Sequence, residues 1–263
     1  DRRMIDCYLN FCRAIFTRYK GKVKYWLTFN EINSATTAMG AFLGQGILNE
    51  IKEMEFMDQV DVPQNRFQGL HHQFIASALA VKMAHEIDPN YQVGCMQIMA
   101  TSYGLTCNPN DQIENQQKNH LMNWFCSDVQ CRGKYPNYIK RYFKENNIEI
   151  KMEEGDEEIL ATGPVDFYTC SYYMSNCQTA DKTKEGGKGT AIEQVLAHYK
   201  FSKEEAIAFG DGENDIDMLL SVGKGIAMGN AAEKVKEIAA DICESVTDDG
   251  IYYYLKSQKL INE

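Results

Sequence analysis

The sequence lacks the cysteine and histidine patterns that bind metals. Its nine cysteines are an odd number, none of them forms a CxxC pair, and none of the five histidines shows HExxH spacing. Several cysteines, such as Cys95 and Cys170, lie within apolar runs, where they serve as small hydrophobic residues. This pattern predicts reduced thiols in a cytoplasmic protein, and neither a disulfide framework nor a zinc site.

Membrane, phosphate-loop and nucleic-acid signatures are also lacking. No apolar run has the length of a membrane span, and no signal-peptide pattern is present. The glycines near residue 210 are not followed by the GK[ST] of a phosphate-binding loop. A net charge of -10 argues against a nucleic-acid backbone as the main partner, although a local site can still bind a small phosphorylated sugar. The oligomeric state is left open.

Residues 1–173 alternate between helical and strand patterns. The strands are apolar throughout, which is typical of a parallel sheet buried on both faces, so we expect an α/β architecture. An acidic segment, residues 151–160, is interpreted as a helix with a solvated face. A long loop region is expected over residues 32–63. The other expected helices are 4–19, 64–87, 111–125 and 138–146, and the expected strands are 23–31, 92–99 and 165–173.

The strand pattern over residues 23–31 ends abruptly in Asn30 and Glu31. An α/β barrel places its catalytic groups at the C-terminal ends of its strands, so Glu31 is a candidate catalytic carboxylate. A strand that simply ends in a polar turn explains the pattern equally well.

The Thr-Phe-Asn-Glu sequence at residues 28–31 resembles the signature of glycoside hydrolase family 1, and residues 6–33 resemble its 6-phospho-β-glucosidase branch. The resemblance implies strands 4–6 of an eight-stranded (β/α)8 barrel and a phosphorylated sugar as the small-molecule substrate, with no cofactor. It implies that Glu31 is the general acid/base and that Asn30 contacts the sugar 2-hydroxyl. The family's tyrosine near the nucleophile matches Tyr173, with Tyr172 as the competing assignment.

A retaining glycosidase of this kind needs a second carboxylate about 5–5.5 Å from the first. Asp166 lies near the start of its strand, roughly 20 Å from the end that carries Tyr173. Asp128 and the acidic residues of 153–158 fall in connecting segments. The sequence therefore predicts an incomplete catalytic pair and impaired turnover. The chain runs from its first residues straight into a helix, and we expect that the first three barrel strands are not part of it.

The pattern changes near residue 188. The segment Gly-Asp-Gly-Glu-Asn-Asp at 210–215 follows a strand and precedes a helix, and it resembles the C-terminal part of the haloacid dehalogenase superfamily, specifically its Cof-type sugar phosphatases. The resemblance implies that Lys188 faces phosphate and that Asp211, Asn214 and Asp215 form a Mg²⁺ site. The DxDG nucleophile motif of that superfamily does not occur upstream. An ordinary Gly/Asp turn is the alternative. The expected strands are 204–209 and 225–228, and the expected helices are 188–199, 216–222, 231–240 and a last one to 260.

The predicted organisation is a partial barrel over residues 1–187 joined to a partial Rossmann-like segment over residues 188–263. Three barrel strands alone leave two open sheet edges, and the strands of the second segment are expected to cover one of them in a single open sheet. Three functions are compatible with this composite: an impaired glycosidase for (6-phospho-)β-glucosides, a Mg²⁺-dependent sugar-phosphate phosphatase relative, and a non-catalytic composite or fragment protein.

Overall fold

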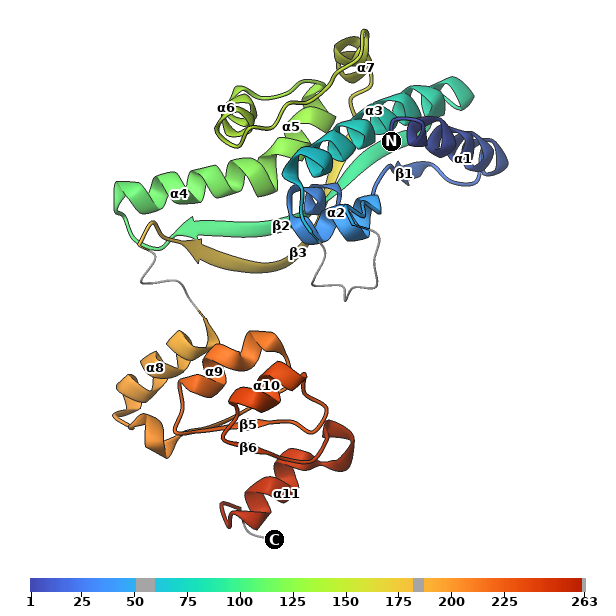
Figure 1. Cartoon of the computed structure of the whole chain (residues 1–263). Helices are drawn as coiled ribbons and strands as arrows, with labels where there is room; N and C mark the ends of the chain where they lie inside the picture. Colours follow the sequence, from blue (N-terminus) through green and yellow to red (C-terminus); the bar gives the residue numbers. More distant parts are fainter. Residues whose placement is uncertain (51–59, 182–186, 262–263) are drawn as a thin grey trace. The chain divides into compact units, whose positions relative to one another are not determined.

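A computed structural model describes residues 1–50, 60–181 and 187–261 of the chain. The chain divides into two compact units, Asp1–Ala180 and Asp181–Glu263 (Figure 1). This division lies seven residues before the expected boundary after residue 187 (187 − 180). Part of the expected loop, residues 51–59, lies outside the described residues, as do residues 182–186.

The first unit is built on a parallel three-stranded sheet with the order β1-β2-β3. Leu27 of β1 pairs with Gly94 of β2, which pairs in turn with Phe167 of β3. All three predicted strands are present, but β1 ends at Leu27, four residues before the predicted end at Glu31, whereas β2 and β3 each continue five residues beyond theirs. Their bounds are Tyr25–Leu27 for β1, Gln92–Gly104 for β2 and Phe167–Gln178 for β3.

Helices connect these strands and cover one face of the sheet (Figure 1). The side chains of Phe16 on α1 and Val81 on α3 pack with Val93 of β2 in one apolar cluster. The prediction of a long loop after the first strand is wrong in part, because the segment contains a short 3-10 helix, η1, and helix α2. The bounds are Met4–Arg18 for α1, Ile32–Thr36 for η1, Ala38–Gln45 for α2, Pro63–Ile87 for α3, Pro109–Asn119 for α4, His120–Trp124 for the π-helix η3, Phe125–Arg132 for α5, Asn137–Glu145 for α6 and Asp156–Thr162 for α7.

The opposite face of the sheet carries large side chains over a glycine. A Cβ atom at Gly94 would lie 2.4 Å from the ring of Phe167, so only glycine leaves room for that ring. The rings of Tyr25 and Phe167 meet edge to face at 6.0 Å, while Tyr25 and Leu27 are exposed. This face corresponds to the interior of a barrel, where side chains from neighbouring strands stack in layers.

The second unit has its own parallel sheet, with the order β4-β5-β6. Its short strands are Ile207–Gly210, Lys224–Ala227 and Asp241–Ile242. The hypothesis of one continuous open sheet is wrong, because within the described ranges β1–β3 and β4–β6 form two separate sheets. The strand β6 gave no recognisable sequence pattern, since it has only two residues. The α-helices are α8 Lys188–Tyr199, α9 Ile216–Leu220, α10 Glu233–Ile238 and α11 Gly250–Ser257, with 3-10 turns η5 Lys203–Glu205, η6 Glu213–Asp215 and η7 Val246–Asp248.

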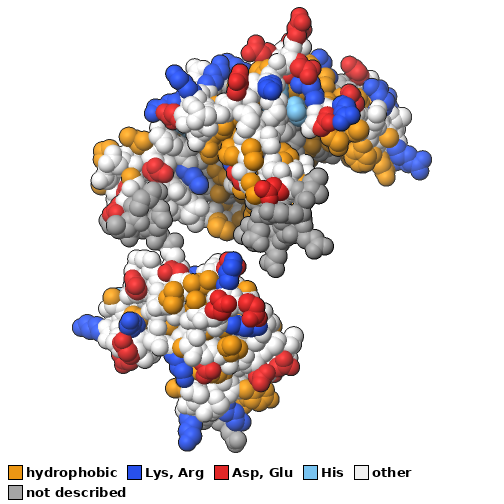
Figure 2. Space-filling view, in the orientation of Figure 1, with side chains coloured by type: hydrophobic (Ala, Val, Ile, Leu, Met, Phe, Trp, Pro, Cys, Tyr) orange, Lys and Arg blue, Asp and Glu red, His pale blue; other side chains and the backbone are white. Residues whose placement is uncertain are grey.

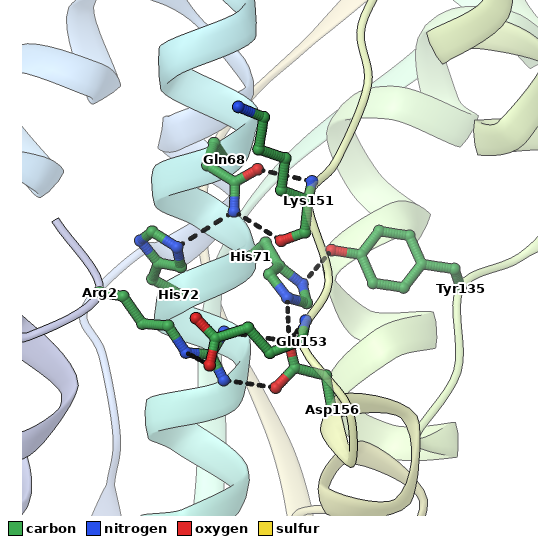
Figure 3. Close-up of polar contacts among 8 residues, drawn as sticks. All are labelled: Arg2, Gln68, His71, His72, Tyr135, Lys151, Glu153 and Asp156. Atoms are coloured by element: carbon green, nitrogen blue, oxygen red, sulfur yellow. Dashed lines mark hydrogen bonds and ion pairs between the residues drawn. The ribbon is translucent and has the colours of Figure 1, made fainter.

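A buried ionic network ties α7 to α3 in the first unit (Figure 3). The carboxylate of Asp156 accepts hydrogen bonds from both terminal nitrogens of Arg2, at 2.5 and 3.0 Å, and from the Glu153 backbone N–H at 2.8 Å. It also lies 3.0 Å from Nε2 of His71, whose Nδ1 is 3.1 Å from the Tyr135 hydroxyl. The interpretation of residues 151–160 as a solvated face is therefore wrong at Asp156, whose side chain is fully buried.

The protonation of this network follows from its partners. Burial lowers the pKa of His71, so the neutral ring donates from Nε2 to Asp156 and accepts from Tyr135 at Nδ1. Although burial alone raises the pKa of Asp156, its hydrogen bonds from Arg2 and His71 lower it to about 2. Both depressed pKa values favour the unfolded state in acid, because the unfolded chain then binds more protons than the folded one.

We predict that Asp156 stabilises the first unit at neutral pH and that this stability is lost in acid. Its contribution is complete above the unfolded carboxyl pKa of about 4 and disappears as pH falls through about 2. Replacing Asp156 by Asn removes a buried charge partner of Arg2 and should lower the free energy of unfolding by about 3 kcal/mol at pH 7.

Urea denaturation followed by tryptophan fluorescence measures this loss in the first unit alone, because both tryptophans, Trp26 and Trp124, lie there. Glu154→Gln is the matched control, since Glu154 is an exposed acid of the same segment. Equal stability of the Asp156→Asn and Glu154→Gln variants at pH 7 would contradict the prediction.

Candidate active site

The segment that follows β1 is anchored through Thr28. Its backbone N–H donates to the carbonyl of Gly94 at 3.2 Å, and its carbonyl accepts from the Tyr8 hydroxyl at 2.6 Å. Its hydroxyl accepts from the Ser77 hydroxyl at 3.0 Å. Thr28 is therefore tied to β2, α1 and α3 at once, and this fixes the point at which the chain leaves the sheet.

The side chains of the next three residues, 29–31, lie in different environments. The ring of Phe29 stacks on the ring of Tyr8, with centroids 4.7 Å apart. Asn30 is exposed, and within the described part of the chain its side-chain amide makes no hydrogen bond. Glu31 is half-buried and has the left-handed backbone conformation, with φ at 48°. That conformation costs a non-glycine residue about 1 kcal/mol, so surrounding contacts must hold it.

Asn33 supplies the contacts that hold this turn against β2. Its side-chain oxygen accepts from the backbone N–H of Ile98 at 2.8 Å, and its amide nitrogen donates to the Ile98 carbonyl at 2.8 Å. The same nitrogen donates to the Met122 carbonyl at 2.7 Å. Asn33 is fully buried, and its amide pairs with Ile98 as the backbone of a neighbouring strand would.

Two asparagines next to or within the π-helix η3 continue this pairing along β2. Asn123 accepts from the Ala100 backbone N–H at 3.1 Å and donates to the Ala100 carbonyl at 2.9 Å. Asn119 donates to the Ser102 carbonyl at 3.2 Å and accepts from Asn123 at 2.6 Å. Side-chain amides therefore satisfy the backbone of β2 beyond the point where β1 ends.

The structure brings Tyr173 and Glu31 together. The Tyr173 hydroxyl donates a hydrogen bond to a carboxylate oxygen of Glu31. Tyr173 sits at an irregularity in the β2–β3 pairing, where Met99 faces Tyr172 and Ala100 faces Met174, so Tyr173 is the extra residue. Such bulges re-aim a side chain next to functional sites. Tyr172, the competing assignment, is the residue that stays in the ladder.

The site around Glu31 has few charged groups. The hydrogen bond to Glu31 raises the pKa of Tyr173, so the phenol stays protonated and acts as a donor. The thioether of Met96 lies 3.2 Å from the Glu31 backbone N–H and 3.9 Å from the Ser171 hydroxyl. Strands β1, β2 and β3 contain no Asp or Glu. Glu31 is therefore a single carboxylate with a phenol donor and without a carboxylate from these strands beside it.

Asp166, the acid considered as a second catalytic group, makes structural contacts at the start of the strands. One carboxylate oxygen accepts from the Val93 backbone N–H at 2.7 Å and lies 2.9 Å from Nε2 of His85. It therefore joins the N-terminal ends of β2 and β3, opposite the ends where Glu31 and Tyr173 meet.

In the second unit, the acidic loop folds around Asp215. One carboxylate oxygen accepts from the backbone N–H groups of Asp211 and Gly212, at 3.0 and 3.1 Å. The other forms an ion pair with Nζ of Lys188, which lowers the pKa of Asp215. Asp211 and Asn214 are exposed, and Asp211 accepts from the Asn230 amide at 3.3 Å. The structure thus brings Lys188 and Asp215 together across the loop.

This arrangement does not fit the expected Mg²⁺ site. Mg²⁺ takes hard oxygen ligands, but both oxygens of Asp215 are already bonded, one of them to a cation. Within residues 1–50, 60–181 and 187–261, no group of three or more His, Cys, Asp or Glu side chains is placed to hold a metal. The Mg²⁺ roles of Asp211, Asn214 and Asp215 stay predictions, as does the phosphate contact of Lys188.

The parallel barrel-type sheet, the Asn-Glu pair beyond its first strand and the tyrosine hydroxyl bonded to the glutamate agree with the family 1 resemblance of the sequence. The chain belongs to glycosyl hydrolase family 1, which it matches over residues 1–209. The family match continues past the predicted boundary at residue 187.

Curated relatives and solved structures also match the chain. A 6-phospho-β-glucosidase from Clostridium longisporum is 46% identical over 205 residues, which are 78% of this chain and 41% of that protein. The β-glucosidase structure from Exiguobacterium antarcticum shares the fold, with a TM-score of 0.55 and 18% identity over 81% of this chain and 49% of that one. The chain thus spans about two fifths of the length of the curated relatives it matches.

A haloacid dehalogenase-like hydrolase from Bacteroides thetaiotaomicron is 35% identical over 28% of this chain and 28% of that one, with a TM-score of 0.28. A TM-score this low carries no conclusion, so membership of that superfamily stays a prediction.

The asparagines that pair with β2 are the residues that sequence reasoning missed. Asn33 stands two residues after Glu31, and Asn119 and Asn123 are four residues apart, spacing that places them on one helical face. This spacing was the available signal in the sequence. It cannot show which backbone groups lack a strand partner.

We predict that Asn33→Ala destabilises the first unit and disorders the Glu31 turn. It leaves the N–H and C=O of Ile98 and the Met122 carbonyl without their partner, which should cost about 2–4 kcal/mol of unfolding free energy. Urea denaturation read by tryptophan fluorescence measures the loss. Asn30→Ala is the matched control and should leave the midpoint unchanged, because the Asn30 side chain is exposed. Equal midpoints for the two variants would show that the amide pairing does not stabilise the turn.

Proposed function

We propose that this chain carries the acid/base half of a glycosidase active site for 6-phospho-β-glucosides. Glu31 protonates the leaving oxygen and later removes a proton from the attacking water, and Asn30 binds the sugar 2-hydroxyl. The observation that supports this most is the contact of Tyr173 with Glu31 beyond the C-terminal end of β1. The exposed Asn30 amide lies beside it in the chain, free to meet a ligand. The reaction needs no cofactor.

The phosphorylated substrate is proposed from the names of the curated relatives, which include 6-phospho-β-glucosidases. Phosphorylated glucosides suit a cytoplasmic enzyme, and we propose that location. None of the described helices combines the length and apolar character needed to cross a membrane. Acidic and basic side chains are interspersed with hydrophobic ones on the visible face of each unit (Figure 2), and we expect no nucleic-acid partner.

We also propose that residues 1–263 by themselves turn over little substrate. Retention of configuration requires a carboxylate nucleophile about 5–5.5 Å from the acid/base. Since β1, β2 and β3 contain no Asp or Glu, that group has to come from another part of a complete barrel.

The deciding experiment restores a complete barrel. Residues 1–180 replace the matching segment of a family 1 6-phospho-β-glucosidase, and hydrolysis of p-nitrophenyl 6-phospho-β-glucoside is measured beside the unphosphorylated glucoside. We expect the chimera to prefer the phosphorylated substrate. Glu31→Gln should lower the chimera's kcat/KM for methyl 6-phospho-β-glucoside by about 10²–10⁴-fold, because a poor alkoxide leaving group needs the general acid. p-Nitrophenolate is a good leaving group, so the p-nitrophenyl substrate serves for the comparison of phosphorylated and unphosphorylated glucosides and should be less affected.

Glu154→Gln, an exposed acid in the same unit, should leave the chimera unchanged. Equal activity of the folded chimera and of its Glu31→Gln variant would contradict the proposal. If the second carboxylate is missing, the 263-residue chain assayed alone should show less than a hundredth of the chimera's rate. This hundredfold loss corresponds to about 3 kcal/mol of transition-state stabilisation.

A matched pair of tyrosine variants tests the assignment of the tyrosine. Tyr173→Phe removes the donor to Glu31 and should lower kcat/KM of the chimera about tenfold, the effect of one hydrogen bond of about 1.4 kcal/mol. Tyr172→Phe should have no effect, because Tyr172 remains in the β2–β3 ladder opposite Met99. The reverse result would transfer the role to Tyr172.

A further inference from the structure

Two thiols meet where α5 packs against β2. Sγ of Cys95 lies 4.0 Å from Sγ of Cys131. Cys95 is fully buried, whereas Cys131 is exposed on the last turn of α5. A disulfide bond is about 2.05 Å long, so the sulfur atoms need to approach by roughly 2 Å. The end of α5 is a place where such a shift is feasible, because the helix stops at Gly133 in the left-handed conformation just beyond Cys131.

The two thiols differ in reactivity. The hydrogen bond from the Cys95 thiol lowers the pKa of Cys131 to about 7, with a smaller contribution from Arg132. The same hydrogen bond, together with burial, raises the pKa of Cys95. Cys131 also lines an open pocket of about 340 Å³ with Trp124 and Tyr168, which gives a small oxidant access to its sulfur. An accessible thiolate beside a second thiol is the arrangement found in oxidation-sensitive proteins.

We propose that Cys131 and Cys95 are an oxidation site that forms an intramolecular disulfide in the presence of a peroxide. The Cys131 thiolate attacks one oxygen of hydrogen peroxide, the S–O bond forms, the O–O bond breaks, and hydroxide leaves and is protonated to water. The Cys95 thiol then attacks the sulfenic sulfur, the S–S bond forms, the S–O bond breaks, and the hydroxyl leaves with the Cys95 proton as a second water. Two thiols are oxidised and one peroxide is reduced.

This disulfide bears directly on the anchor of the Glu31 turn. The residue next to Cys131 is Gln130, whose amide nitrogen donates to the Ser77 hydroxyl at 3.0 Å and lies 3.4 Å from the Thr28 hydroxyl. The Gln130 carbonyl accepts from the Val165 backbone N–H at 2.9 Å. Formation of the disulfide draws Cys131 toward β2, and this movement therefore alters or fixes the Gln130 contacts that position Thr28.

The test uses the whole chain and hydrogen peroxide at one equivalent. Free thiols are counted in denaturant, and cross-linked tryptic peptides are located by fragmentation in mass spectrometry. We expect the count to fall from nine to seven, with a link between Cys95 and Cys131 that a reductant removes. Cys131→Ser should retain all its thiols under the same conditions. Cys107→Ser, a change at another exposed cysteine, should still lose two.

Cys95→Ser separates the two steps, because it should stop at a sulfenic acid on Cys131 that dimedone traps. If Cys95→Ser does not fold, the exposed Cys131→Ser variant by itself decides. A wild-type chain that keeps nine thiols, a link between other cysteines, or a Cys131→Ser variant that loses two thiols at the wild-type rate would overturn the proposal.

Discussion

The pairing of side-chain amides with the free edge of β2 makes the glutamate site geometrically feasible. The strand β1 pairs with β2 only as far as Gly94 of β2, whereas β2 itself continues to Gly104. An edge strand inside a protein leaves N–H and C=O groups that must find partners. Asn33, Asn123 and Asn119 supply them in place of backbone. Because the chain after β1 does not have to hydrogen-bond to the rest of β2, it can turn away at Thr28 and bring Glu31 toward Tyr173.

The same physical rule organises the acidic loop of the second unit. There, the carboxylate of Asp215 satisfies the backbone N–H groups of Asp211 and Gly212 and pairs with Lys188. A side chain used in this way determines the shape of the loop and has few lone pairs left for an external cation. The contacts of Asp215 account for the shape of the loop among the described residues.

The parts of the fold that sequence reasoning predicted are those with a long, regular signal. The helix α3 and the strands β2 and β3 have sustained apolar patterns, and all three were expected near their observed positions. Contacts between distant residues were not predictable. Asp156 stands in an acidic run that reads as solvent-exposed, yet Arg2 and His71 surround it, 154 and 85 residues away in sequence. The bulge that aims Tyr173 depends equally on a pairing register that no local pattern encodes.

The left-handed backbone of Glu31 has a consequence for how this sequence can drift. Glycine and asparagine adopt that conformation at lower cost than glutamate, so the fold by itself favours their presence at position 31. Folding stability and the proposed proton transfer therefore favour different residues at position 31. Glycine at position 31 would therefore lower the backbone cost of the turn, and it would at the same time remove the carboxylate on which the proposed proton transfer depends.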